Sequence, residues 1–269
     1  MPIDWRHVLG GAADRAQEAL AALGHDAWAD DMGIGADGTT TSRADAAAEA
    51  AALDFLIESV PGVSICSEEA GIHDGGGDTL LIVDPVDGTN NAVRGIPYWA
   101  FSVGVVVDGE PVAGFVRNVP AQVDYFACDG TAFVGDDPVV AGDVTKLGDA
   151  TLVLQRPAEP GALDLSRTLM ASCTLARMLG AAALDLAAVG AGQAHGYVNA
   201  NVSEGWPFGE KVVDYAGAAV FTAAAGGVVT DANGMPPSFE PDLAARTVIV
   251  SACTSELHAQ LLEILNSGS

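Results

Sequence analysis

An apolar strand pattern runs directly into acidic residues in the segment LLIVDPVDGTNNAV, residues 80–93. Pro85 follows Asp84 and has no N–H group with which to continue a strand ladder. We therefore expect a buried strand that stops at Asp84. Asp84 and Asp87 are then expected to protrude from its carboxyl end.

The residues that follow favour an anion. Gly88 permits a sharp turn, and Thr89 is expected to begin a helix whose free N–H groups attract a phosphate. Two carboxylates beside such a site make sense when divalent cations lie between them. Ligand sets made only of oxygen select hard ions, and Mg²⁺ is the usual partner of phosphate oxygens. The alternative is an Asx turn in which Asp84 caps the helix.

Further carboxylates follow other apolar segments. The run in SICSEEAG ends in Ser67, Glu68 and Glu69, which resembles the end of the first strand. Asp214 is a lone acid in KVVDYAGAAVF, with apolar neighbours on both sides. Taken singly, a Glu-Glu pair is typical of a solvated face, and Asp214 is typical of an acid that stabilises a helix start.

Composition indicates a soluble cytoplasmic protein. The chain has 269 residues, of which 49% are hydrophobic, enough for a large core. Its 4 cysteines lie far apart without a C-x-x-C pair, so neither a zinc ribbon nor a disulfide framework is expected. Residues 1–24 lack the pattern of a signal peptide, and no apolar run is long enough for a membrane span.

Net charge excludes two classes of partner. The chain carries 36 Asp and Glu against 11 Lys and Arg, a formal charge of −25, which repels nucleic acid and anionic membranes. The acids are spread along the chain, which favours a halophilic source over an acidic interaction tail. In molar salt the Debye length falls to ~3 Å, so self-repulsion is largely screened.

Two helices followed by β-rich runs are expected in the first half. Apolar and alanine residues recur at helical spacing over residues 4–23 and 42–59, where Ser42 and Asp45 resemble a capping box. Short β-rich runs follow, and Asp108-Gly109 and Asp129-Gly130 are hairpin signals between them. A largely antiparallel sheet is therefore expected. Residues 33–38, GIGADG, match a dinucleotide fingerprint, but no expected strand precedes them, so a plain glycine loop is favoured.

The second half alternates strand and helix. After the turn-rich residues 135–149, TLVLQ leads to a helix near 164–172, and the chain ends in the helix SELHAQLLEIL. This alternation is typical of a second layered α/β unit. We expect an amino-terminal α+β half over residues 1–148 and a smaller carboxy-terminal α/β half over residues 149–269.

Four motifs resemble the inositol monophosphatase superfamily, which also includes archaeal fructose-1,6-bisphosphatases and phosphoadenosine phosphatases. DPVDGTNN is similar to its D-P-[IV]-D-G-[TS] signature and SEEAG to its glutamate motif. RMLGAAALDLAAVGAGQAHGYV is similar to its R-x-x-G-S-A-A-L-D-L stretch, and VVDYAGAAVFTAAAGG to its W-D-x-A-A-G region. The motifs stand in family order from about Gly35 to the end. The resemblance implies an αβαβα sandwich like that of the sugar phosphatases, and a homodimer.

The resemblance also assigns roles. It implies two to three Mg²⁺ ions, a water-activating group and a phosphate cradle. The implied metal ligands are Glu68, Asp84, the carbonyl of Val86, Asp87 and Asp214. The implied catalytic residues are Asp45, Glu68 and Thr89, and the implied phosphate-binding backbone is that of Gly88, Thr89 and Asn90.

Three departures concern the substrate. Val213 replaces the family's Trp, Ala181 replaces a serine, and the acid that grips a sugar alcohol has no secure counterpart. Candidate substrate contacts are Glu204, Glu210 and Lys211, and Lys211 is also compatible with a surface lysine paired to Glu210.

The sequence thus predicts a Mg²⁺-dependent phosphomonoesterase for a small phosphorylated molecule. Inositol-1-phosphate and fructose-1,6-bisphosphate are the favoured substrates. A 3′-phosphoadenosine-5′-phosphate phosphatase, or a family member that binds metal or polyanion without turnover, are the alternatives.

Overall fold

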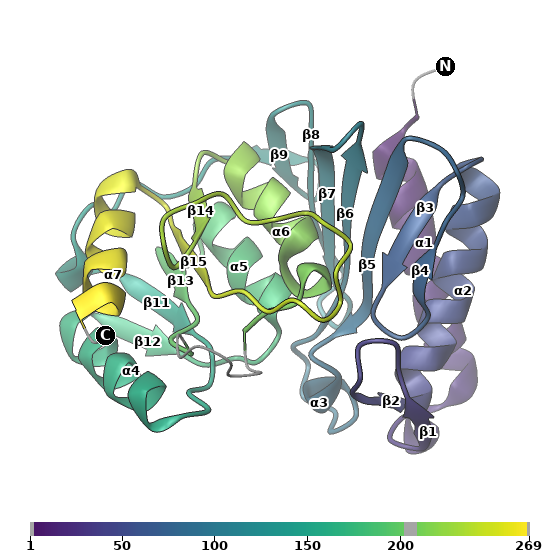
Figure 1. Ribbon diagram of the computed structural model, residues 1–269, viewed down its shortest axis with the longest axis horizontal. Helices are drawn as coiled ribbons and strands as arrows, with labels where there is room; N and C mark the ends of the chain where they lie inside the picture. Colours follow the sequence, from purple (N-terminus) through teal and green to yellow (C-terminus); the bar gives the residue numbers. More distant parts are fainter. Residues whose placement is uncertain (1–2, 202–208, 268–269) are drawn as a thin grey trace.

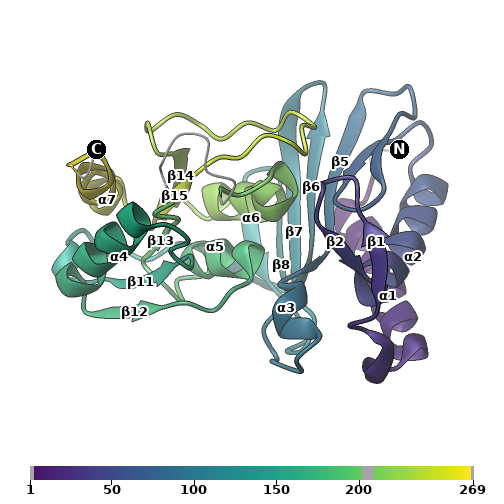
Figure 2. The same cartoon turned by 60° about the horizontal axis from the view of Figure 1, so that its bottom comes forward.

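Helices and sheets alternate in αβαβα layers in the computed structural model, which describes residues 3–201 and 209–267 (Figure 1). Helices α1 (Trp5–Leu23) and α2 (Arg43–Ser59) cover the outer face of a larger sheet. Helices α5 (Ala182–Gly190) and α6 (Val212–Ala224) lie between this sheet and a smaller one (Figure 2). The layered class and both long amino-terminal helices are confirmed, as is the capping box of Ser42 and Asp45.

The larger sheet has eight strands in the order β10-β9-β8-β7-β6-β5-β3-β4. All neighbours are antiparallel except β3 and β5, so the expected, largely antiparallel sheet is confirmed. Asp108-Gly109 and Asp129-Gly130 form tight turns, with all four residues at positive φ. The strands are β3 (Ser64–Ser67), β4 (Gly71–His73), β5 (Thr79–Asp87), β6 (Ala100–Val107), β7 (Glu110–Asn118), β8 (Val123–Cys128), β9 (Thr131–Val134) and β10 (Asp137–Val139).

The smaller sheet has five strands in the order β12-β11-β13-β15-β14. Strand β11 is parallel to both neighbours, whereas β15 is antiparallel to both of its own. Helices α4 (Pro160–Ser172) and α7 (Ser255–Ser267) cover its far side (Figure 1). The strands are β11 (Thr151–Leu154), β12 (Leu175–Arg177), β13 (Gly196–Val198), β14 (Val228–Asp231) and β15 (Ile249–Ala252).

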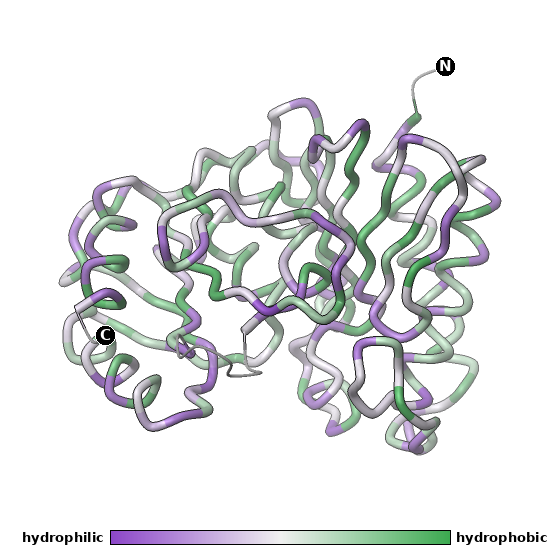
Figure 3. Tube along the Cα trace, in the orientation of Figure 1, coloured by the Kyte–Doolittle hydropathy of each residue, from purple (hydrophilic) through white to green (hydrophobic). Residues whose placement is uncertain are grey.

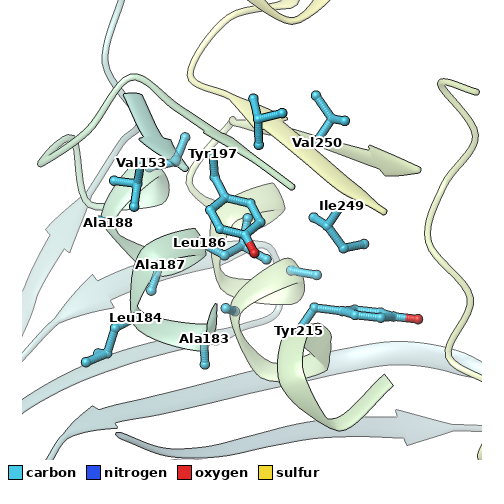
Figure 4. Packing of buried hydrophobic residues seen from close by; sticks show 14 of the residues in the cluster. Val153, Ala183, Leu184, Leu186, Ala187, Ala188, Tyr197, Tyr215, Ile249 and Val250 are labelled. Atoms are coloured by element: carbon cyan, nitrogen blue, oxygen red, sulfur yellow. The ribbon is translucent and has the colours of Figure 1, made fainter. Parts of the chain in front are cut away.

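The larger sheet is buried on both faces, so its strands contribute to two hydrophobic cores. On β6, Phe101 and Val103 point toward α1 and α2, whereas Ala100 faces α5 and α6. Tyr197 of β13 lies among Leu186 and other apolar side chains of the inner core (Figure 4). Along the whole trace, hydrophobic segments follow the strands and inner helices, and hydrophilic ones gather at the turns (Figure 3).

Strand β5 is longer than expected. It does not stop at Asp84: it pairs Asp84 with Ser102 and then, after an irregularity, Asp87 with Ala100 of β6. The expected end at Asp84 was wrong because Pro85 lies within a bulge, where a missing N–H group breaks no ladder bond.

A short hairpin precedes α2. Strands β1 (Asp31–Ile34) and β2 (Thr40–Ser42) pair antiparallel, so the expected glycine loop is the tip of a hairpin that lies beside α2 (Figure 2). After β5, Gly88 has φ 85° and precedes the single-turn helix α3 (Thr89–Ala92). No helix among the described residues is long and apolar enough to cross a membrane.

Candidate active site

Two parallel strands bring the first acidic residues together. Strands β3 and β5 pair Ser67 with Val83, so the residues that follow, Glu68 and Asp84, leave the same edge of the sheet side by side. Glu49 of α2 holds the turn after β3, because its carboxylate accepts hydrogen bonds from the Ser67 hydroxyl and, at 3.1 Å, from the N–H of Glu69. The position of Glu68 is therefore fixed from both sides.

Asp87 connects the larger sheet to α5. One carboxylate oxygen accepts a hydrogen bond from the N–H of Ala182 and the other from the N–H of Ala183, each at 2.9 Å. These are free N–H groups at the start of the helix, where a negative charge is stabilised. Asp84 uses one oxygen to accept from the N–H of Val86 at 3.0 Å, which holds the bulge in place.

Asp214 is brought to the same place by α6. Its carboxylate accepts a hydrogen bond from the Lys211 N–H at 2.7 Å, at the amino end of the helix. The Lys211 side chain then reaches back across the site. Its ammonium contacts Asp37 of the β1–β2 turn and lies 2.6 Å from Oε1 of Glu68.

The four carboxylates lie close enough to raise one another's pKa. Burial raises the pKa of Asp84 and of Asp87 well above the usual carboxyl range, and neighbouring carboxylates raise both further. Burial raises the pKa of Glu68 to about 8, with Lys211 opposing and Asp214 adding to the rise. The pKa of Asp214 is raised by burial, against the effect of Lys211. A nearby cation is therefore needed to keep these carboxylates negatively charged.

The donor set fits a hard divalent ion in its chemistry. All side-chain donors are carboxylate oxygens, which Mg²⁺ and Ca²⁺ prefer, and those of Asp84 and Asp87 belong to buried residues. In the geometry of residues 3–201 and 209–267, however, no group of three or more His, Cys, Asp or Glu side chains is arranged to hold a metal. The carboxylates face protein donors instead, and the ammonium of Lys211 supplies the positive charge.

A second group lies beside the carboxylates. The hydroxyl of Thr89 lies 3.0 Å from a carboxylate oxygen of Asp45 and 3.0 Å from the Val86 carbonyl. Burial raises the pKa of Asp45, although hydrogen bonds from Ser42 and Thr89 oppose the rise. The structure thus places together the two residues that were expected to act as a pair, although they are 44 positions apart.

A cavity of about 600 Å³ opens onto this pair. Gly88 and Asn90 line it beside Thr89, and Arg94 contributes a positive charge at its edge. Arg94 donates to the Asn90 carbonyl and, at 2.8 Å, to its side-chain oxygen. Other residues that line the cavity are Ala29, Thr39, Thr40, Ser42, Asp45, Glu68, Glu69, Val93 and Gly180.

The candidate substrate contacts fall in different places. Lys211 is mostly buried, and it pairs with Asp37 and Glu68 rather than with Glu210. Glu210 is buried, and its carboxylate accepts from the Tyr197 hydroxyl and from the N–H of Ile249. Glu204 lies outside the described residues.

Sequence reasoning missed Asp37 and Glu49. Asp37 belongs to a hairpin tip whose partner is 174 positions away, and no local pattern indicates that contact. Glu49 did leave a signal: it stands four residues after Asp45 on α2, so both acids share the helix face that meets the site.

Comparisons with known proteins identify the family. The Inositol monophosphatase family model matches residues 5–268. A fructose-1,6-bisphosphatase/inositol-1-monophosphatase of Methanothermobacter thermautotrophicus is 30% identical over 283 residues, 97% of this chain and 96% of the relative. An inositol-1-monophosphatase of Mesorhizobium japonicum is 35% identical over 205 residues, 73% and 74% of the two chains.

Solved structures show the same fold. The extragenic suppressor protein suhB from Bartonella henselae superposes with a TM-score of 0.84 at 26% identity, covering 98% of this chain and 99% of that one. The Thermotoga maritima IMPase superposes with a TM-score of 0.82 at 22% identity, covering 99% and 98%. Fold, motif order and full-length similarity lead to one conclusion: the chain belongs to the inositol monophosphatase family.

Proposed function

We propose that the protein is a Mg²⁺-dependent phosphomonoesterase that acts on small phosphorylated sugars or polyols. The favoured substrates are inositol-1-phosphate and fructose-1,6-bisphosphate, after which the two relatives above are named. The observation that carries the proposal is the pairing of Thr89 with Asp45 at the edge of the carboxylate cluster. A protein that only bound a polyanion would have no use for such a pair.

The carboxylate cluster would hold the metal. Glu68, Asp84, Asp87 and Asp214, with the Val86 carbonyl, provide ligands for two to three Mg²⁺ ions. Bound there, the ions would lower the pKa of a water molecule and offset the charge of the phosphate and the departing oxygen. A net charge of −25 makes such compensation necessary for any phosphorylated ligand.

Thr89 and Asp45 would handle the proton of the attacking water. When the Thr89 hydroxyl donates to Asp45, its oxygen is left to accept a hydrogen bond from that water. The water proton moves to Thr89 as the Thr89 proton moves to Asp45. The raised pKa of Asp45 makes it a stronger base than a carboxylate of ordinary pKa. The water oxygen bonds to phosphorus while the P–O bond to the sugar or polyol breaks.

The turn after β5 would hold the phosphate. Gly88, Thr89 and Asn90 line the cavity, and backbone N–H groups at such a turn donate to phosphate oxygens. Gly88 is in the left-handed conformation, and a Cβ added there would come within 3.0 Å of the Ala181 side chain. A larger residue at position 88 would therefore displace the turn.

Two alternatives remain as proposals. A 3′-phosphoadenosine-5′-phosphate phosphatase would use the same metal and water chemistry on a nucleotide. A binder without turnover draws support from a relative named Nus factor SuhB in Pasteurella multocida, 30% identical over 197 residues, 71% of each chain. We also propose that the protein is a homodimer in a salt-rich cytoplasm, which sedimentation in molar KCl would test.

Phosphate release distinguishes these functions. The protein is incubated in molar KCl with each of the three substrates, with Mg²⁺ or with a chelator. We expect Mg²⁺-dependent release from inositol-1-phosphate, fructose-1,6-bisphosphate or both, at a higher rate than from the nucleotide. Faster phosphate release from the nucleotide would favour the nucleotide phosphatase. No release from any of the three substrates would favour the binder without turnover.

A further inference from the structure

One residue of the motif DPVDGTNN has no part in the chemistry proposed above. Asn91 ends this motif and lies in α3, the helix of 4 residues that follows the turn at Gly88. A helix this short is not stable by itself, because forming its first turn fixes several residues for very few hydrogen bonds. The position of the turn is therefore fixed by contacts that α3 makes with the rest of the molecule.

The half-buried amide of Asn91 joins α3 to two other segments. Its nitrogen Nδ2 lies 2.8 Å from the carbonyl oxygen of Tyr98, shortly before β6, and 2.8 Å from that of Leu179, in the loop between β12 and α5. Carbonyl oxygens only accept hydrogen bonds, so the two N–H groups of the amide donate, one to each partner. Because Asn91 and Leu179 are 88 positions apart, this side chain connects α3 to the second half of the chain.

The loop between β12 and α5 lies directly against the turn at Gly88. A Cβ added to Gly88 would lie 3.0 Å from the Ala181 side chain and 3.2 Å from the Gly180 carbonyl oxygen. The same loop leads into α5, whose first N–H groups donate to Asp87. Asp87 and Asn91 thus hold the loop and the start of α5 at two points, one before the turn and one after it.

The other partner of Asn91 also leads to α5. Tyr98 accepts from Asn91 through its carbonyl, and its hydroxyl donates to a carboxylate oxygen of Asp185 on α5 at 2.8 Å. Both hydrogen bonds of the Asn91 amide therefore connect α3 to α5, one through the loop and one through Tyr98.

We infer that Asn91 is a positioning residue whose two hydrogen bonds keep the turn of Gly88, Thr89 and Asn90 in the place that phosphate binding requires. The inference rests on the proposed function, in which this turn holds the phosphate that is cleaved. Asn91 is not among the described residues that line the cavity beside Thr89, so it acts through the turn and not on the substrate. Without its amide, the hydrogen bonds of Asp87 to α5 remain. The metal ligands then keep their place while the turn gains freedom.

Calorimetry separates the turn from the metal ligands. Asn91→Ala removes both donors. Mg²⁺ is titrated into the folded variant in molar KCl, and inorganic phosphate is titrated at saturating Mg²⁺. We expect phosphate to bind about tenfold more weakly than to wild type, because apparent affinity falls with the fraction of molecules in which the turn keeps its place. Mg²⁺ affinity should be unchanged.

Two further variants complete the test. Asn91→Gln keeps the amide on a longer side chain and should recover part of the phosphate affinity. It also provides the comparison if Asn91→Ala does not fold. Asn233→Ala is the matched control, because Asn233 is exposed in the turn after β14, the edge strand opposite β12.

The outcomes separate this inference from the proposed function. Phosphate affinity that falls no more than Mg²⁺ affinity would overturn the inference, and so would failure of both Asn91 variants to fold, since Asn91 would then serve the fold as a whole. Wild type that binds phosphate without hydrolysing any of the three substrates would count against the proposed function and leave the comparison of affinities intact. No phosphate binding by wild type would count against both.

Discussion

The ammonium of Lys211 lies 2.6 Å from Oε1 of Glu68, in the middle of the residues that would hold a metal. Burial alone would lower the pKa of Lys211, but Glu68 and Asp214 raise it above its ordinary value, so the side chain stays charged. The chain thus carries its own cation for its carboxylate cluster. A divalent ion that used Glu68 would compete with that ammonium for the same oxygen.

Replacing Lys211 should make the protein depend on metal for its stability. Lys211→Met leaves Glu68 and Asp37 without their buried partner, which costs on the order of 3 kcal/mol of unfolding free energy without divalent ions. Mg²⁺ should restore most of the loss and should bind more tightly than in wild type. Urea unfolding and calorimetry, each with and without Mg²⁺, measure both effects.

The only other lysine provides the control. Lys146→Met removes the same type of side chain from a position outside the cluster, and it should change neither stability nor Mg²⁺ affinity. A loss in Lys211→Met that Mg²⁺ does not reduce would mean that the lysine acts only in packing.

Asp84→Asn should abolish metal binding and activity together. Asp84 is buried beside Glu68 and Asp87, and its neutral amide would remove one anionic ligand from the proposed ions. Changing a residue that only hydrogen-bonds to a metal ligand typically lowers metal affinity or activity by about 10–100-fold. Losing the ligand itself should cost more, so we expect activity to fall by more than about 100-fold. Phosphate release and Mg²⁺ calorimetry give the measurement, with the exposed Asp78→Asn as control. Near-normal turnover at saturating Mg²⁺ would reject the role.

Thr89 and Asp45 should behave as one unit. Thr89→Val removes the hydroxyl, and Asp45→Asn removes the carboxylate that would take up its proton, so each should lower kcat by roughly 10²–10⁴-fold. The double variant should be no slower than the slower single variant, since residues that act together are not additive. Thr89→Ser keeps the hydroxyl and should retain most of the rate. If the fold loss of kcat in the double variant equals the product of the two single losses, the two residues act separately.

The sequence predicts the elements of this fold better than it predicts their ends. Helix periodicity places α1 and α2 correctly, and the Asp-Gly pairs mark two hairpins, because both signals are local. The end of β5 is missed because Pro85 is tolerated in a bulge that only the pairing with β6 reveals. Strand β14 also lacks a pattern of its own, and its place depends on β15.

In the candidate site too, local signals are predicted from the sequence and contacts between distant segments are not. Glu68 and Asp84 could be paired from their strand ends, and the motif order brings in Asp45 and Asp214. The contact of Lys211 with Asp37 and Glu68 could not be predicted, because it joins three segments through one long side chain. Lys211 was one candidate substrate contact and was also compatible with a surface lysine, and the structure pairs its ammonium with Asp37 and Glu68.

The salt requirement is a further prediction. With a net charge of −25, we expect repulsion among acids to destabilise the fold in dilute buffer. Molar salt shortens the Debye length to ~3 Å and should restore the fold. Circular dichroism across a KCl series measures the change. Full structure in dilute buffer would contradict a halophilic origin.

Stability should fall as the pH rises from about 5 to about 8, and Asp185 should account for part of the change. Burial raises the pKa of Asp185 from 3.8 to about 7, although the hydrogen bond from the Tyr98 hydroxyl at 2.8 Å opposes the rise. Over this pH range the carboxyl group of the folded protein stays protonated at pH values at which the same group in the unfolded chain has lost its proton. Raising the pH therefore lowers the free energy of unfolding. A difference of one bound proton that persists over two pH units changes the free energy of unfolding by about 3 kcal/mol.

Asp185→Asn should remove that contribution, because an amide does not titrate and its oxygen can still accept from Tyr98. Relative to wild type, the variant should gain about 3 kcal/mol of unfolding free energy between about pH 5 and pH 8. Urea unfolding in molar KCl across this range gives the comparison, and Asp164→Asn, at an exposed position on α4, serves as the control. Parallel curves for wild type and Asp185→Asn would show that Asp185 is ionised in the folded protein throughout, since only a group protonated in one state and not the other makes stability depend on pH.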